Sequence, residues 1–204
     1  MTIEHANLSG NQLHEPKGVS GASAGTYYLA DGASGGSWSV IYATAEDTSI
    51  SSQANVEITG LSGYSDIVVV LERVAYDASG DLDLTVGNAG GYTADYSWVL
   101  KYNTTETVNG SDTTIPINVD SGSGTYYSSC AIRISNFNKD KYSLFDWVAT
   151  TSTTADITGT TFASIGLARV NEEDAYDRLK ITPTTGTLTG TAVRVFGLKG
   201  TSDA

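Results

Sequence analysis

The stretch that decides the fold is YDRLKITPTTGTLTGTAVRVFGLK, which runs from Tyr176 to Lys199 near the end of the chain. Its first half alternates the apolar Leu179 and Ile181 with charged residues, and in its second half Val193, Val195 and Gly197 alternate with Arg194, Phe196 and Leu198. Strict alternation directs successive side chains to opposite faces of a sheet, so it predicts two strands. The Thr- and Gly-rich connector between the halves has turn chemistry. We therefore predict a late pair of strands that closes a β-sandwich.

The same pattern recurs upstream of this stretch. Apolar alternation is broken by turn residues at spacings of about 8 to 12 residues, which is typical of an all-β sandwich. No stretch of ten or more residues has a helical period. Further strands are predicted over residues 26–30, 38–42, 55–61, 66–74, 82–86, 96–102, 115–117, 125–137, 142–151 and 162–170.

Several positions within this pattern carry more specific expectations. The apolar run Ile67 to Leu71 is continuous, which predicts a central strand covered on both faces. Pro116 lacks an amide donor and restricts its strand to a sheet edge. The polar residues 103–114 are expected to form a long loop. Residues 138–141 and 171–174 are expected to form two polar turns, the first of them closing the clearest hairpin of the chain.

Composition bounds the class of protein. The chain has 204 residues and 40% hydrophobic content, enough for one sandwich with an ordinary core. A formal charge of −12 repels phosphate backbones and argues against a nucleic-acid partner. No apolar run approaches the length of a membrane span, and the N-terminus lacks the signature of a signal peptide, so we expect no membrane contact and synthesis in a cytoplasm. Cys130 is the single cysteine, and its strand-like surroundings indicate a buried small side chain.

The residues do not assemble a recognisable reaction centre. Both histidines, His5 and His14, lie in a Gly-rich segment that would not fix metal ligands. The acidic cluster Glu172, Glu173, Asp174 and Asp177 does not have the spacing of a calcium loop, and a solvated turn is the favoured interpretation. No motif of a hydrolase, a nucleotide-binding protein or a metalloprotease occurs. We predict no catalytic residue, no cofactor and no metal site.

The first 36 residues differ from the rest. They hold only short apolar pieces between Gly, Ser and Ala, too little to bury a core of their own. We predict an extended N-terminal arm over residues 1–36, with one short strand at 26–30, followed by a β-sandwich domain over residues 37–204. Such an arm either stays mobile or becomes ordered when a neighbouring protein binds it.

Two segments carry a resemblance to a known class of proteins. The arm sequence LHEPKGVSGASAGTYYLADGASGGSW, residues 13–38, resembles the N-terminal segment of small virion proteins of tailed bacteriophages. The closing element Phe196-Gly197-Leu198-Lys199 is similar to the last strand of jelly-roll modules in phage decoration, fibre and tail proteins. The resemblance covers about a quarter of the chain. It implies a non-enzymatic virion protein with a jelly-roll-like antiparallel β-sandwich.

Within that resemblance, a capsid decoration (cement) protein on the virion surface is the favoured function, with the major capsid protein as its partner. The chain lacks the repetitive shaft of a long fibre. Tyr-rich strands and the continuous apolar run indicate faces that meet other copies, and decoration proteins imply a homotrimer. The alternative is a tail- or fibre-associated module that binds a receptor glycan, which an exposed Trp98 or Trp147 would mark. A cellular carbohydrate-binding module is a third class, but it leaves the arm unexplained.

The attachment site is predicted within the arm. It consists of Leu13, His14, Glu15, Pro16, Lys17 and Gly18. Leu13 offers an apolar side chain to a pocket on the partner, and Pro16 holds the preceding residue extended, which lowers the entropy lost on docking. His14 and Glu15 can hydrogen-bond across the contact, and Lys17 can pair with an acidic partner.

Overall fold

The structure, a computed structural model, describes residues 26–30, 36–40, 43–48, 50–77, 80–118, 124–154 and 159–199. The described residues form fifteen strands and no helix, so the all-β prediction is confirmed. None of them belongs to a helix long and apolar enough to cross a membrane. The chain divides into two compact units, Met1–Tyr42 and Ala43–Ala204.

The first unit contains a small antiparallel hairpin. Strand β1 (Thr26–Ala30) lies at the residues predicted for the single strand of the arm, and it pairs with β2 (Gly36–Val40). Tyr28 stands opposite Trp38 in this ladder. The strand predicted over residues 38–42 therefore begins at Gly36 and pairs within the first unit.

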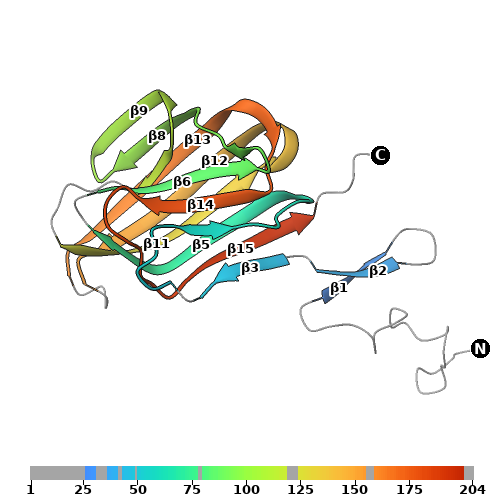
Figure 1. The fold of residues 1–204 in the computed structure, drawn as a ribbon, viewed down its shortest axis with the longest axis horizontal. Coiled ribbons are helices and arrows are strands. Elements are labelled where there is room, and N and C mark those ends of the chain that lie inside the picture. The colour runs from blue at the N-terminus through green and yellow to red at the C-terminus, as the bar shows by residue number, and fades with distance from the viewer. Residues whose placement is uncertain are drawn as a thin grey trace, which may run out of the picture. The chain divides into compact units, whose positions relative to one another are not determined.

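The second unit, here called the body, holds two antiparallel sheets packed face to face (Figure 1). The larger sheet has eight strands in the order β3, β15, β5, β11, β12, β13, β8, β9, with bounds Ala43–Asp47, Ala192–Lys199, Tyr64–Asp77, Thr125–Ser135, Asn138–Ser152, Thr161–Ala175, Tyr96–Tyr102 and Thr105–Asp112. The smaller sheet has the order β10, β6, β14, β4, with bounds Ile115–Asn118, Leu82–Asn88, Arg178–Pro183 and Val56–Ile58, and the short β7 (Gly91–Tyr92) pairs with β6.

The pairing of these strands is nested. The first strand of the body, β3, pairs with the last, β15, and β4 pairs with β14. Inside them, β5 pairs with β11 and β6 pairs with β10. This nesting across two sheets is jelly-roll topology, so the predicted jelly-roll sandwich is confirmed. The late strands β14 and β15 lie in opposite sheets, and the chain closes the sandwich by crossing from one sheet to the other.

Two hairpins are inserted into this plan, and both extend the larger sheet. The first is β8–β9, and it corrects the sequence prediction, because residues 103–114 contain strand β9 (Thr105–Asp112) rather than a long loop. The prediction failed because β9 is an edge strand whose side chains are mostly exposed and polar. Strand β9 extends the sheet through its backbone hydrogen bonds to β8. Those bonds do not depend on apolar side chains, so the sequence of β9 shows no apolar alternation.

The second insertion is β12–β13, and it corrects the two predicted polar turns. Residues 138–141 begin β12 and residues 171–174 lie near the end of β13, so neither segment is a turn. The two segments pair with each other, with Lys141 opposite Asp174. Opposite charges that face each other across a ladder stabilise paired strands. Charged residues are also common in turns, so the sequence alone does not distinguish a strand from a turn here. The chain leaves β11 through Asn136, whose φ is 59°.

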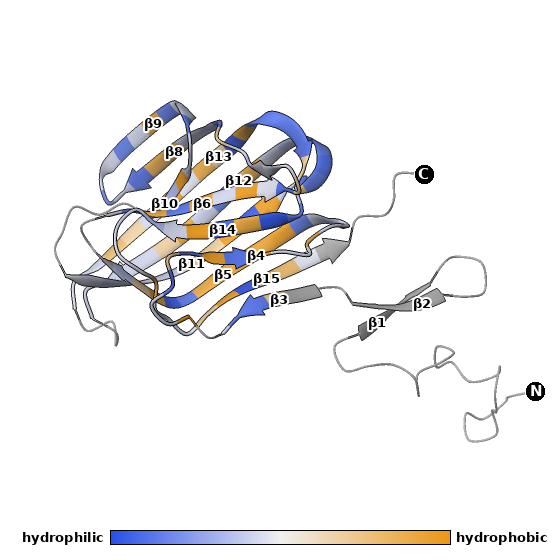
Figure 2. Cartoon of the chain, in the orientation of Figure 1, coloured by the Kyte–Doolittle hydropathy of each residue, from blue (hydrophilic) through white to orange (hydrophobic). Residues whose placement is uncertain are grey.

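The core lies between the inner faces of the two sheets, where apolar and polar residues alternate along the strands (Figure 2). Trp147 of β12 is fully buried and donates its indole N–H to the carbonyl oxygen of Ile117 at 3.1 Å. Tyr96 of β8 is also buried, and its hydroxyl accepts a bond from the Val86 amide at 2.9 Å. Cys130 is buried, as predicted. Strand β10, which contains Pro116, lies at a sheet edge, also as predicted.

Strand β5 differs from its prediction. It is central in the larger sheet, between β15 and β11. Ile67, Val69 and Leu71 point into the core and are buried, but Val68 and Val70 on the other face are only partly buried. The described residues thus cover this strand on one face only, and the prediction of cover on both faces is wrong.

Candidate functional site

The attachment residues predicted from the sequence, Leu13 to Gly18, lie outside the described residues, as do His5 and His14. The candidate site that the structure presents is on the body. It is the face of the eight-stranded sheet that points away from the smaller sheet, here called the outer face.

The outer face carries apolar side chains that remain exposed. Among the described residues, every large hydrophobic side chain that is strongly exposed lies on it. These residues are Val99, Val108, Tyr142, Leu144, Val148, Ile165 and Leu167, and their exposed fractions range from 37% to 65%. Single exposed apolar residues are ordinary on a protein surface, whereas a contiguous group on one sheet is typical of a contact surface.

Strand register makes this group contiguous. Leu167 stands opposite Asp146 on one side and Val99 on the other, and Val99 faces Val108. One row along, Val148 stands opposite Ile165 and Ala131. Directly opposed side chains lie about 5 Å apart in an antiparallel sheet, so the apolar positions touch their neighbours across the strands.

Strand β13 shows that these side chains are on the outside for a structural reason. Its inner positions are small, with Ser164, Gly166 and Ala168 facing the core, while the larger Ile165 and Leu167 face outward. A Cβ on Gly166 would lie 2.0 Å from Cζ2 of Trp147. The buried Trp147 therefore requires glycine opposite it. A slip of one residue would bury Ile165 and Leu167, but it would bring a larger side chain against the indole.

Charged residues on the outer face are largely paired with one another. Arg133 Nε contacts Asp146 at 2.8 Å between the apolar positions. Arg194 Nε contacts Glu46 at 2.9 Å, and its Nη1 also contacts Glu72. The guanidinium of Arg169 lies 5.4 Å from the centroid of the Tyr142 ring. Exposed pairs of this kind add little stability, but they leave few charges for a partner to neutralise.

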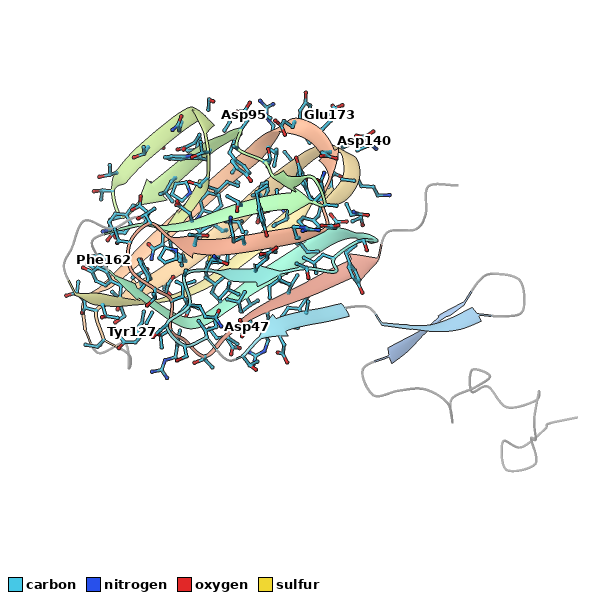
Figure 3. All side chains as sticks on the ribbon, in the orientation of Figure 1. Asp47, Asp95, Tyr127, Asp140, Phe162 and Glu173 are labelled. Carbon is cyan, nitrogen blue, oxygen red and sulfur yellow. The ribbon has the colours of Figure 1, made fainter. Side chains whose placement is uncertain are left out.

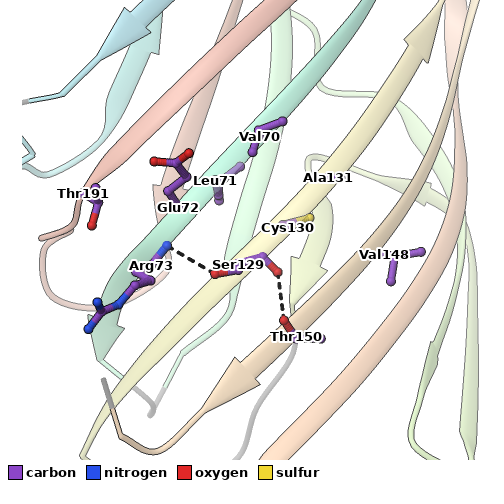
Figure 4. Close-up of a pocket in the computed structure, with 10 residues that line it drawn as sticks. All are labelled: Val70, Leu71, Glu72, Arg73, Ser129, Cys130, Ala131, Val148, Thr150 and Thr191. Carbon is purple, nitrogen blue, oxygen red and sulfur yellow. Dashed lines mark hydrogen bonds between the residues drawn. The ribbon is translucent and has the colours of Figure 1, made fainter. Parts of the chain in front are cut away.

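Two broad hollows interrupt the outer face. The first, of about 640 Å³, lies over β5, β11 and β12 (Figure 4), and its lining includes Val70, Ala131 and Val148. The second, of about 350 Å³, lies over β8, β9 and β13, and its lining includes Val99, Val108 and Leu167. Burial raises the pKa of the Cys130 thiol beside the first hollow, which disfavours the reactive thiolate.

A separate cleft of about 550 Å³ lies between the β8–β9 hairpin and the edge of the smaller sheet. Its lining combines carboxylates, threonines and aromatic side chains: Asp81, Asp83, Trp98, Leu100, Tyr102, Thr105, Thr107, Asp112, Thr114 and Pro116. Asp83 is 9% exposed and accepts a hydrogen bond from the Thr114 hydroxyl at 3.0 Å. The pKa of this carboxyl is raised to about 6, chiefly by burial and less by the charges of Asp81 and Asp112, while the hydrogen bond from Thr114 lowers it.

The tryptophans that would have marked a glycan site are in the core. Trp98 is 8% exposed and Trp147 is 2% exposed. The indole N–H of Trp98 donates to Asp112 Oδ2 at 3.1 Å. Neither ring offers a free face for stacking on a sugar.

The acidic cluster near residue 174 lies at one end of the body, where Asp95, Asp140 and Glu173 also project (Figure 3). Three of its members, Glu172, Asp174 and Asp177, have partners within the fold. Glu172 accepts a bond from the Thr93 hydroxyl at 2.9 Å, and Asp174 accepts one from Asn88 Nδ2 at 2.6 Å. Among the described residues, no three His, Cys, Asp or Glu side chains gather closely enough to hold a metal ion.

A scan against models of known protein families finds no match to this chain, and a search of curated proteins finds none either. The resemblance to phage virion proteins thus remains a prediction that rests on the residues quoted above. The outer face was not predicted as a site. The signal for it was present in FASIGLARV, residues 162–170, where Ile165 and Leu167 alternate with much smaller residues.

Proposed function

We propose that this protein is a non-enzymatic structural component of a tailed-phage virion, of the capsid decoration type. The observation that carries the proposal is the gathering of the exposed large apolar side chains on one sheet face of an acidic jelly roll. Exposed apolar area favours aggregation in a solitary protein, and it is retained where another protein covers it. An assembly protein provides such cover.

In this proposal the arm and the body have different tasks. Residues 1–36 bind the major capsid protein, with Leu13 to Gly18 as the anchor, and the body stands on the capsid surface. The contact of each arm can be weak, because many copies on one shell add their contributions. Among the described residues, the sandwich core includes residues from Ile50 to Val195, all of them in the body.

Attachment is tested with purified particles that lack the native protein. The full chain should bind them, and Leu13→Asp should bind at least about tenfold more weakly, since an unpaired charge in an apolar pocket costs more than about 1.4 kcal/mol. Leu8→Asp, in the same arm but outside the anchor, is the matched control and should bind normally. Equal binding by Leu13→Asp, and by a chain without residues 1–36, would exclude the arm as the anchor.

Copy number decides the place in the virion. On the order of hundreds of copies per particle, counted by quantitative mass spectrometry, fit a shell built from many symmetric capsomers. About a dozen copies would instead place the protein in the tail or at the portal. Incubation of the pure protein with host capsule or lipopolysaccharide should leave the glycans intact, and shortened glycans would contradict a non-enzymatic role.

A second candidate function is a tail- or fibre-associated module that binds a glycan. The cleft beside β9 favours it, because carboxylates, hydroxyls and Tyr102 are side-chain types that hydrogen-bond and stack on sugars. The matched test fills the cleft with Thr107→Trp and compares saccharide binding by calorimetry with that of the wild type. Saccharide binding that Thr107→Trp abolishes would favour this candidate over the decoration protein.

A further inference from the structure

The outer face has the composition of a protein contact. Its centre is formed by Leu144, Val148, Ile165 and Leu167, which are each at least half exposed. Around them lie Arg, Lys, Glu and Asp side chains on the flanking strands. An apolar centre with a polar rim is the anatomy of protein–protein interfaces, and a flat sheet face most readily packs against another sheet.

Charge identifies which partner fits. Five cations lie on the outer face, Arg73, Lys101, Arg133, Arg169 and Arg194, and six carboxylates accompany them, Glu46, Asp66, Glu72, Glu106, Asp146 and Glu173. These described residues give the face a net charge of −1, five cations against six carboxylates, although the chain carries −12, so most of that charge resides elsewhere. Two copies of an acidic protein repel each other at most orientations. At this nearly neutral face they meet with little net repulsion.

Area also fits a second copy. The apolar group and its rim span the seven strands from β15 to β9, or about 34 Å at the usual strand spacing, and about 20 Å along β12. Multiplied together, these lengths give a flat area of about 700 Å², to which the uneven surface of the side chains adds. Stable pairs of proteins bury about 600–1,000 Å² on each partner, so the area of the outer face lies within the usual range.

We infer that the outer face of the larger sheet is buried against the same face of a second copy of this chain. The pairing is isologous: Ile165 and Leu167 on β13 of each copy lie against the hollow over β5, β11 and β12 of the other. This inference rests on the proposed function, because the outer face is the observation that carries that function and the inference names its partner. It gives two-fold pairs, whereas the homotrimer expected from the resemblance would need a different contact.

The test is the mass of the full-length protein by light scattering after size exclusion. The wild type should have twice the chain mass of 21.4 kDa. The double variant Ile165→Lys/Leu167→Lys should have the chain mass, because four lysines would face one another in the pair. Thr59→Lys, an exposed position outside the outer face, is the matched control and should remain paired.

Folding of the variants is checked by far-UV circular dichroism and thermal unfolding. If the double variant does not fold, Val148→Lys on β12 replaces it in the same measurement. A monomeric or trimeric wild type overturns the inference, as does a folded variant that keeps the doubled mass. A monomer in which residues 1–42 cover the face would be one such result.

Particle binding separates this inference from the proposed function. A monomeric lysine variant that still binds particles through its arm supports both. A paired wild type that fails to bind particles supports the pairing and refutes the virion role.

Discussion

Asp83 gives a prediction whose size and sign can both be derived. Its carboxyl lies on β6 at the wall of the cleft, 9% exposed, with the Thr114 hydroxyl as a hydrogen-bond donor. Burial raises its pKa from an ordinary 3.8 to about 6. A difference of about two pH units corresponds to about 3 kcal/mol, which is an upper bound for the penalty of holding this charge in the folded state.

The sign follows from proton linkage. A carboxyl whose pKa is higher in the folded state binds more protons when folded, so stability decreases as pH rises between about 4 and 6. Below pH 4 the group is neutral in both states, and above pH 6 it is charged in both. Asp83→Asn keeps the shape and removes the charge. The variant should therefore be more stable than the wild type at pH 8, by about 1–3 kcal/mol, and nearly equal to it at pH 4.

The assay is urea unfolding followed by tryptophan fluorescence, since Trp98 and Trp147 are both buried. Other carboxylates also respond to pH, but they are common to both proteins and cancel in the difference. Asp140→Asn removes the same charge at an exposed position and is the control for net charge. A stability difference that is the same at pH 4.5 and pH 7.5 would refute the assignment of a buried, destabilised carboxylate.

Further predictions concern the core. Gly166→Ala should lower the free energy of unfolding by about 1–3 kcal/mol, because the new Cβ would overlap the Trp147 ring. Gly110→Ala, whose Cβ would have no atom within 4 Å, should change the free energy of unfolding little. The buried Cys130 should resist a thiol reagent until urea unfolds the protein, and prompt reaction of the native protein would contradict its burial. Far-UV circular dichroism should give a β spectrum, and helix above about one third would contradict the fold.

The sequence predicts the parts of this fold that depend on local chemistry. Alternation in YDRLKITP and AVRVFGLK locates β14 and β15, because burial on one face requires a period of two. Pro116 identifies β10 as an edge strand, because proline cannot donate to a ladder. Cys130 is correctly predicted to be buried, since a small apolar side chain within a strand pattern is most often in the core.

Errors arose where pairing depends on a distant strand. Strand β9 is polar, and only its backbone bonds to β8 distinguish it from a loop. Lys141 and Asp174 are residue types that are common in turns, but they oppose each other in the ladder between β12 and β13. Because they are far apart in the sequence, the sequence does not reveal this pairing. The run from Ile67 to Leu71 suggested cover on both faces. A strand with an exposed contact face has the same composition as one buried on both sides.

The two inserted hairpins explain why this jelly roll has an unpartnered face. Both β8–β9 and β12–β13 join the larger sheet, so eight strands stand against a smaller sheet of four principal strands. Strand β10 contacts β8, β12 and β13, and with it the smaller sheet buries the inner face of the extension. The outer face gains area from the same insertions, and within the described part of the body no strand covers it. Because Trp147 fills the space opposite Gly166, β13 must direct Ile165 and Leu167 outward. The core packing of the extended sheet thus generates the apolar face, and the nearly neutral charge of that face supports the proposed pairing with a second copy.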